Sequence, residues 1–302
     1  MENKIPVVAL LFAGAIWAAT AFSYKFFLAA GISIAIIFVV TRLFKMLSVL
    51  AIARYNNVHK LNLSDKREFF FLILNAIFSL GTPVLFVLAL THTSLTNVYF
   101  IHYTMPAWVF IMAALFLGET INAKKAIAVA GTVMGVLLIS NPQEIFSVNP
   151  GIIFAVLSAI SFAGDIITAR ELRDYSYHAV SIYSNALQLL LFTVTSLLIF
   201  NNQSAIVSLV DIGFLSAIGV FLGIASYLYY YSLQKIDAST AAIISLSELL
   251  FTFVLGFFIL GEIPKGFEFL GYILISSSAL VLLLRKADIE RFENLIFMRK
   301  KH

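Results

Sequence analysis

The chain has 302 residues, of which 61% are hydrophobic and 12% charged, and it contains no cysteine. Soluble domains have roughly 45–50% apolar and about 25% charged residues, so lipid is the expected surroundings of most of this chain. Ten membrane spans of roughly 20 residues each would use about 200 positions and leave no room for a soluble domain. The absence of cysteine argues against a disulfide scaffold, a cysteine-ligated metal or iron–sulfur centre, and a thiol nucleophile.

Ten continuous apolar runs are long enough to cross a bilayer. Helices are expected rather than a β-barrel, because the runs do not alternate in polarity and an isolated span must satisfy its own backbone hydrogen bonds. The first run follows Lys4, but its length and the nine later runs indicate a retained helix rather than a signal peptide. The expected fold class is all-α and integral to the membrane, with transmembrane helices at residues 5–24, 32–53, 69–90, 95–117, 125–140, 152–169, 179–200, 212–233, 238–260 and 267–284.

The lysines and arginines predict the orientation of these helices. Arg42 and Lys45 fall inside the second run, and with both termini cytoplasmic only Lys25 and Lys265 of the remainder lie outside. This distribution is a positive-inside signal and predicts a multi-pass protein of the cell (inner) membrane. The net charge of +4 therefore follows from topology and does not indicate a nucleic-acid partner.

Two halves of the chain resemble each other. The tripeptide Leu-Gly-Glu at residues 117–119 recurs 143 residues later at 260–262, at the end of the fourth and ninth runs. A five-span unit is odd, so its second copy must enter the membrane from the opposite side, which is typical of alternating-access transporters. We expect a first repeat at 5–140, a second at 150–285 and a basic amphipathic cytoplasmic tail at 286–302. Further matching positions are Leu90 with Leu233, Ser94 with Asp237, and Gly131 with Gly271.

Several residues in this arrangement carry a family resemblance: Trp17, Arg42, Pro106, residues 117–119, Gly131, Ser247-Glu248, residues 260–262 and Gly271. Their order along ten spans resembles the EamA-like branch of the drug/metabolite transporter superfamily over roughly residues 5–285. Members of that family move amino acids, nucleotide-like metabolites, sugars or drugs, so the resemblance implies transport and leaves the cargo open. Leu249 follows Glu248 where such proteins often have proline, so only the first half offers a proline, Pro106, for a helix break.

Charged residues inside predicted spans are the first substrate-binding candidates, because burying them in lipid is costly. Glu248 lies near the middle of the ninth run and could bind a substrate ammonium group or a coupling proton. Arg42 lies at a similar depth in the second run and could bind a carboxylate through two parallel hydrogen bonds. The alternatives are a static Glu248–Arg42 salt bridge and an Arg42 that extends toward the interface. Ser245 lies one turn before Glu248, and the mixed charges would suit a zwitterion.

Aromatic residues supply further candidates. Tyr99, His102, Tyr103 and Pro106 share one helical face in the fourth run, which indicates a cavity-facing stripe, although an aromatic belt or a helix contact is the alternative. Tyr227 is the deepest of three tyrosines near the end of the eighth run and could line the same pathway. Trp17 lies too deep for an interface anchor, so packing and substrate stacking both remain open for it.

Acidic residues elsewhere are candidates for gating or coupling, together with Pro106. Asp165 in the sixth run is expected to pair with a lysine or arginine or to lie near the cytoplasmic mouth. An intramembrane aspartyl protease would need a Gly-x-Gly-Asp element and a Tyr-Asp element, but residue 162 is phenylalanine and no aspartate follows a tyrosine. Glu119 and Glu262 lie at span ends, where helix caps or gate contacts are the expected roles.

The sequence contains no zinc-binding His-Glu-x-x-His, no Gly-x-Ser-x-Gly elbow and no Walker motif, so we expect neither an enzyme nor a bound metal or cofactor. We predict a secondary-active transporter of an amino acid or related metabolite that works by alternating access. The alternative is an exchanger or importer of a larger cationic metabolite, or a multidrug exporter. The expected partners are a small organic solute, the lipid bilayer, a coupling proton or counter-solute, and possible second copies in a homodimer. The cavity should be lined by the first, third, fourth, sixth, eighth and ninth spans.

Overall fold

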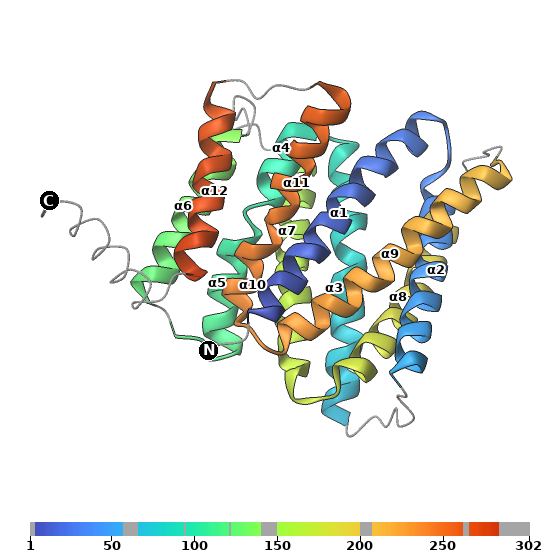
Figure 1. The fold of residues 1–302 in the computed structure, drawn as a ribbon, viewed down its shortest axis with the longest axis horizontal. Helices are drawn as coiled ribbons and strands as arrows, with labels where there is room; N and C mark the ends of the chain where they lie inside the picture. Colours follow the sequence, from blue (N-terminus) through green and yellow to red (C-terminus); the bar gives the residue numbers. More distant parts are fainter. Residues whose placement is uncertain are drawn as a thin grey trace, which may run out of the picture.

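The computed structural model describes residues 4–56, 66–93, 95–120, 122–139, 150–199, 207–261 and 266–283, and all regular structure in these ranges is helical. Figure 1 shows the helices packed side by side in one bundle. The helices are α1 (Ile5–Ala29), α2 (Ile34–Tyr55), α3 (Lys66–Leu90), α4 (Leu95–His102), α5 (Met105–Phe116), α6 (Ala123–Ile139), α7 (Pro150–Glu171), α8 (Tyr177–Ile199), α9 (Leu209–Leu233), α10 (Ala238–Ser245), α11 (Ser247–Leu255) and α12 (Phe267–Leu283). A 3₁₀ turn, Leu172–Asp174, follows α7, and a π-helical turn, Gly256–Leu260, follows α11.

Each of the ten predicted spans coincides with one helix or with two consecutive helices. Within the described part of the chain, seven helical segments are long and apolar enough to cross a membrane: α1, α2, α3, α7, α8, α9 and the run Ala238–Ile259. Large apolar side chains such as Phe12, Leu115, Phe214 and Phe258 are exposed on the outer faces of the bundle. Exposed apolar surface of this extent is expected where helices face lipid.

The fourth and ninth predicted spans are both broken near their middle. Tyr103 and Thr104 separate α4 from α5, and Pro106 is the second residue of α5. Leu246 separates α10 from α11, although no proline is present there. The second break, for which the sequence offers no proline, therefore exists. Close packing accompanies it, because a Cβ atom placed on Gly14 of α1 would lie 2.4 Å from Ser247 Oγ.

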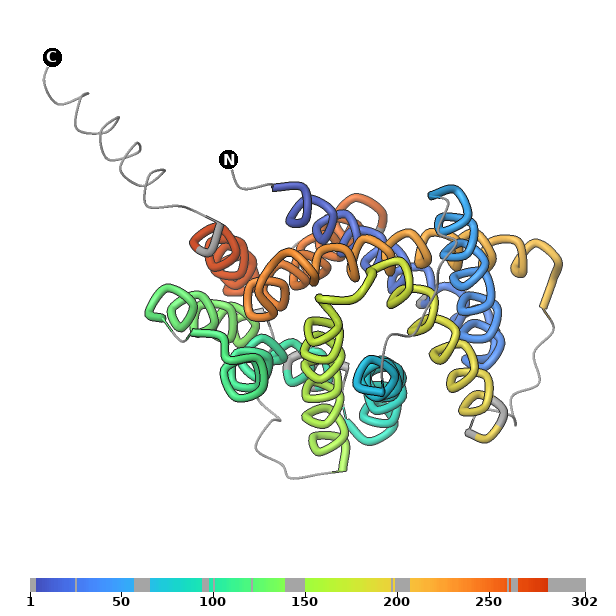
Figure 2. The backbone as a smooth tube through the Cα atoms, turned by 90° about the horizontal axis from the view of Figure 1, so that it is seen from below, coloured from blue at the N-terminus to red at the C-terminus, as the bar shows by residue number. Residues whose placement is uncertain are grey.

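The helix contacts are repeated between the two halves, in which α1, α2 and α3 correspond to α7, α8 and α9. α3 packs on α7 as α1 packs on α9, and α2 packs on α9 as α3 packs on α8. Two further pairs, α2 with α8 and α6 with α12, join equivalent helices of the two halves. Figure 2 shows α6 and α12 side by side at one edge of the molecule. The chain is thus folded as two five-span repeats related by a pseudo-two-fold axis, as inverted repeats require.

The repeated Leu-Gly-Glu tripeptides end the broken spans in the same way. Gly118 has φ of 64° and Gly261 has φ of 68°, both in the left-handed region. A glycine in this conformation commonly terminates a helix, because it lacks the Cβ that would clash there. The repeat in the sequence is therefore a repeat of helix ends.

Candidate functional site

A cavity of about 690 Å³ lies between the two repeats. Its walls come from the six spans expected from the sequence and also from α2 and α8. These two helices were not among the expected lining spans, although Arg42 of α2 was a substrate-binding candidate. Leu28, Ile34 and Leu90 place part of its wall beside the α1–α2 and α3–α4 connections. No residue of α10, and no residue of α1 before Trp17, lines it. The cavity therefore extends toward the face that carries those two connections.

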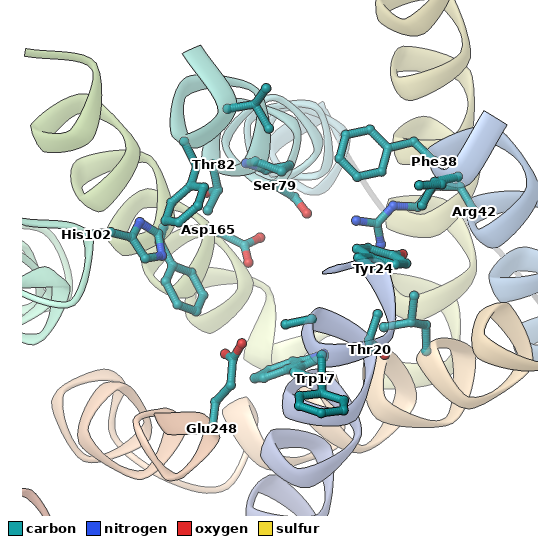
Figure 3. A pocket seen from close by; sticks show the side chains of 18 of the residues that line it. Trp17, Thr20, Tyr24, Phe38, Arg42, Ser79, Thr82, His102, Asp165 and Glu248 are labelled. Atoms are coloured by element: carbon teal, nitrogen blue, oxygen red, sulfur yellow. The ribbon is translucent and has the colours of Figure 1, made fainter. Parts of the chain in front are cut away.

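One side of the cavity is acidic and aromatic. Glu248 is the second residue of α11, directly after the break at Leu246, and its carboxylate points into the cavity (Figure 3). Among the described residues, no hydrogen bond or ion pair holds this carboxylate, and Trp17 and Tyr99 line the same cavity. A carboxylate beside aromatic rings is suited to binding a cation.

The predicted stripe on the fourth span lies in this wall. Tyr99 and Tyr103 stack with ring centroids 5.6 Å apart, and both line the cavity together with His102. Ser158 donates its hydroxyl hydrogen to the Thr82 carbonyl at 2.8 Å, so its oxygen accepts from Nδ1 of His102 at 3.0 Å. In a neutral imidazole, this arrangement leaves Nε2 of His102 as a hydrogen-bond acceptor. Pro106 is buried in α5 and does not line the cavity.

The opposite side of the cavity is basic. The guanidinium carbon of Arg42 lies 4.4 Å from the ring centroid of Phe192, and the Arg42 Nε has no hydrogen-bond partner among the described residues. Figure 3 shows Arg42 across the cavity from Glu248, beside Tyr24 and Phe38. The described residues contain no Arg42–Glu248 salt bridge, so the static cross-link considered above is absent.

Asp165, which was expected to pair with a lysine or arginine or to lie near the cytoplasmic mouth, lies at the cavity wall. Its Oδ1 accepts from Asn75 Nδ2 at 2.7 Å and its Oδ2 accepts from the Tyr229 hydroxyl at 3.0 Å. The expected direct pairing with a lysine or arginine is not found in the described structure. The sequence could not reveal this, because Asn75 lies 90 positions away from Asp165.

Two of the substrate-binding candidates, Ser245 and Tyr227, do not line the cavity. Ser245 is buried and donates to the Ala241 carbonyl at 2.9 Å. Tyr227 bonds to His178 Nδ1 and packs on the Tyr177 ring at 5.5 Å between centroids. Glu262 and the tail at 286–302 lie outside the described residues.

Glu119 links the two repeats on the side opposite the cavity opening. Its carboxylate accepts from the Ala238 backbone N–H at 2.6 Å and from the Ser239 hydroxyl at 2.8 Å. Lys125 Nζ lies 3.1 Å from Glu119 and 3.1 Å from Asp237. A residue at the end of the first repeat's fourth span thus caps the first helix of the broken span in the second repeat. This contact joins the two repeats at that end of the bundle.

Gln188, Tyr229 and Tyr230 line the cavity and Asn75 bonds to its wall, although none of them was predicted as a substrate-binding residue. Gln188 Oε1 accepts from Lys45 Nζ at 2.9 Å, and the two residues are 143 positions apart, which is the repeat spacing. That spacing was the available signal, because equivalent residues of inverted repeats can meet on the pseudo-two-fold axis.

Comparisons with known proteins agree with this architecture. Residues 4–141 and 149–284 match the EamA-like transporter family. The chain is 25% identical over 202 residues to the pseudopaline exporter CntI of Pseudomonas aeruginosa, covering 66% of this chain and 69% of that protein. It is 28% identical over 158 residues to an uncharacterized transporter of Archaeoglobus fulgidus, covering 52% of this chain and 56% of that protein.

A crystal structure with 15% sequence identity superposes on 93% of this chain and 96% of its own with a TM-score of 0.76, which shows a shared fold. The family match covers both halves of the chain, in agreement with the two repeats of the structure. The chain therefore belongs to the EamA-like transporter family and is a multi-pass membrane transporter rather than an enzyme.

Proposed function

We propose that this protein is a secondary-active transporter that moves an amino acid or a related small metabolite by alternating access. The observation that carries the proposal is the cavity between the repeats, with Glu248 free on one side and Arg42 on the other. A solute with an amine and a carboxylate could satisfy both groups at once. We place both termini in the cytoplasm and the protein in the cell (inner) membrane, following the distribution of lysine and arginine.

The alternating-access part of the proposal is supported by the different state of the two ends of the bundle. The cavity extends toward the α1–α2 and α3–α4 connections. The other end is held closed by Glu119 against α10. In inverted repeats, the two halves can exchange conformations, which would open the closed end and close the open one. A coupling proton or counter-solute would supply the energy for net movement.

The class of solute is supported by the size and chemistry of the cavity. A volume of about 690 Å³ lies within the usual range of roughly 300–1,000 Å³ for small-molecule sites. A second candidate function is the export of a larger metabolite that carries an amine. It is supported by the same volume, by the aromatic wall around Glu248 and by the similarity to an exporter of pseudopaline.

The test is counterflow in proteoliposomes that are preloaded with one unlabelled solute at a time. The panel contains amino acids, amines, nucleotides and sugar phosphates, and uptake of the labelled solute is measured. Uptake of an amino acid that disappears in Glu248→Gln, with the folded yield unchanged, supports the proposal. Uptake of amines alone supports the second candidate. Uptake of nucleotides or sugar phosphates alone contradicts both.

A further inference from the structure

A chain of hydrogen bonds joins two oppositely charged residues at the cavity wall. We propose that Lys45 and Asp165 neutralise each other through Gln188, Tyr230 and Asn75. The ligand then meets one free cation, Arg42, and one free anion, Glu248, which selects a zwitterion without net charge. This inference rests on the proposed function and names the charge of its substrate.

The donors in the chain all point in one direction. Lys45 Nζ donates to Gln188 Oε1 at 2.9 Å, and Gln188 Nε2 donates to the Tyr230 hydroxyl at 3.2 Å. Tyr230 donates to Asn75 Oδ1 at 2.8 Å, and Asn75 Nδ2 donates to Asp165 Oδ1 at 2.7 Å. Each group is polarised by the one before it. The positive charge of Lys45 therefore stabilises the negative charge of Asp165 through the four hydrogen bonds between them.

Burial makes this pairing necessary. The exposed fraction is 8% for Lys45 and 7% for Asp165, and 2% or less for the three neutral residues between them. A buried charge without a partner strongly destabilises the folded protein. Replacing one residue of a buried ion pair therefore lowers the stability more than replacing both residues. Gln188 and Asn75 are amides, which release a proton only with great difficulty. The chain therefore fixes the two charges in place and does not conduct protons.

Arg42 and Glu248 differ from this pair because, among the described residues, neither is held by a hydrogen bond or an ion pair to the protein; the Arg42 guanidinium packs on the Phe192 ring instead. Arg42 Nε has no hydrogen-bond partner, and the Glu248 carboxylate has none among the described residues. With Lys45 and Asp165 cancelling each other, the four charged groups of the cavity leave one positive and one negative site for the ligand. A net-neutral ligand with one amine and one carboxylate restores the balance in full.

The first experiment measures pairing without any substrate. The melting temperatures of purified Lys45→Met, Asp165→Asn and the double variant form a double-mutant cycle. We expect each single variant to be less stable than the double variant, because each leaves one buried charge uncompensated. Additive losses would overturn the proposal, whatever the protein transports.

The second experiment measures charge selectivity by counterflow with leucine, phenylalanine and methionine. Each is offered as the zwitterion, as the cationic amide and as the anionic N-acetyl form. Wild type should prefer the zwitterion. Lys45→Met should shift the ratio toward the amide, and Asp165→Asn toward the N-acetyl form, by roughly tenfold each, since one charge is left unbalanced near the ligand. The double variant should restore the preference for the zwitterion.

A third variant tests selectivity without replacing Lys45 or Asp165, so that poor folding of those two variants cannot decide the result. Gln188→Glu preserves the shape of the side chain and gives Lys45 a direct anionic partner, which leaves Asp165 unbalanced. It should shift selectivity toward the amide, as Lys45→Met does. Unchanged selectivity in Gln188→Glu, or a double variant that stays shifted, would overturn the proposal. Failure of wild type to transport any of these compounds would contradict the proposed substrate class instead, and the melting-temperature cycle would still decide the pairing.

Discussion

The Glu119 carboxylate contacts the start of α10 and Glu248 lies in the first turn of α11, but the surroundings of these two carboxylates are opposite. Glu119 comes from the other repeat and accepts from two donors at the start of α10, with Lys125 beside it. Glu248 belongs to the first turn of α11 and has no partner among the described residues. A carboxylate whose donors are all supplied by the protein is part of the scaffold. One that points unpaired into a cavity is available to a ligand.

The largest effect is expected from removing the charge of Glu248. Glu248→Gln should reduce counterflow by roughly thirtyfold to several thousandfold, since losing one partner of a desolvated charge pair costs about 2–5 kcal/mol. Melting temperature and yield should stay close to wild type, because no hydrogen bond or ion pair holds this carboxylate among the described residues. Asp174→Asn, at an exposed carboxylate, is the matched control. Loss of folded protein in Glu248→Gln would assign this residue to the scaffold with Glu119.

A smaller effect is expected at Arg42, on the opposite wall. Arg42→Gln should weaken apparent affinity by roughly ten- to a hundredfold, since a hydrogen bond to a charged group contributes about 1.5–3 kcal/mol. Arg42→Lys should lie in between, because it keeps the charge but loses the planar fork. Arg173→Gln serves as the control at a more exposed site. An unchanged concentration dependence of uptake in Arg42→Gln would mean that the basic wall does not meet the solute.

Glu119 should affect the conformational equilibrium rather than substrate affinity. Glu119→Ala removes the cap of α10, and loss of a cap costs about 1–2 kcal/mol, or roughly five- to thirtyfold in an equilibrium. The chain contains no cysteine, so a single Ala242→Cys on α10, buried in this structure, reports on opening of the closed end. Its thiol labelling should become faster in Glu119→Ala and stay slow in Asp174→Asn. Equal labelling rates would show that Glu119 does not hold this end closed.

The sequence predicted the spans and the two repeats, because the length of apolar runs and the spacing of Leu-Gly-Glu depend on local composition. It did not predict which faces line the cavity. Ser245 and Glu248 would share a face on a continuous helix, but the break at Leu246 separates them. On α9, Tyr227 points to α8, and the cavity face is formed by Ser226, Tyr229 and Tyr230 with Leu222. The hydrogen-bond network was also out of reach, since Tyr230 and Asn75 are 155 positions apart.

The smallest effect is expected at the break itself, where Leu249→Pro would introduce the proline that family members often have. Leu249 is the third residue of α11, and its N–H donates to the Leu246 carbonyl at 3.0 Å. A proline there removes one hydrogen bond in the first helical turn, where it is tolerated, so transport should stay within about twofold of wild type. Phe253→Pro, in the interior of α11, should instead cost about 3 kcal/mol or more. A Leu249→Pro protein as unstable as Phe253→Pro would mean that the break depends on the bond to Leu246. Near-normal transport in Leu249→Pro would mean that packing of α1 against Ser247 is sufficient to position Glu248.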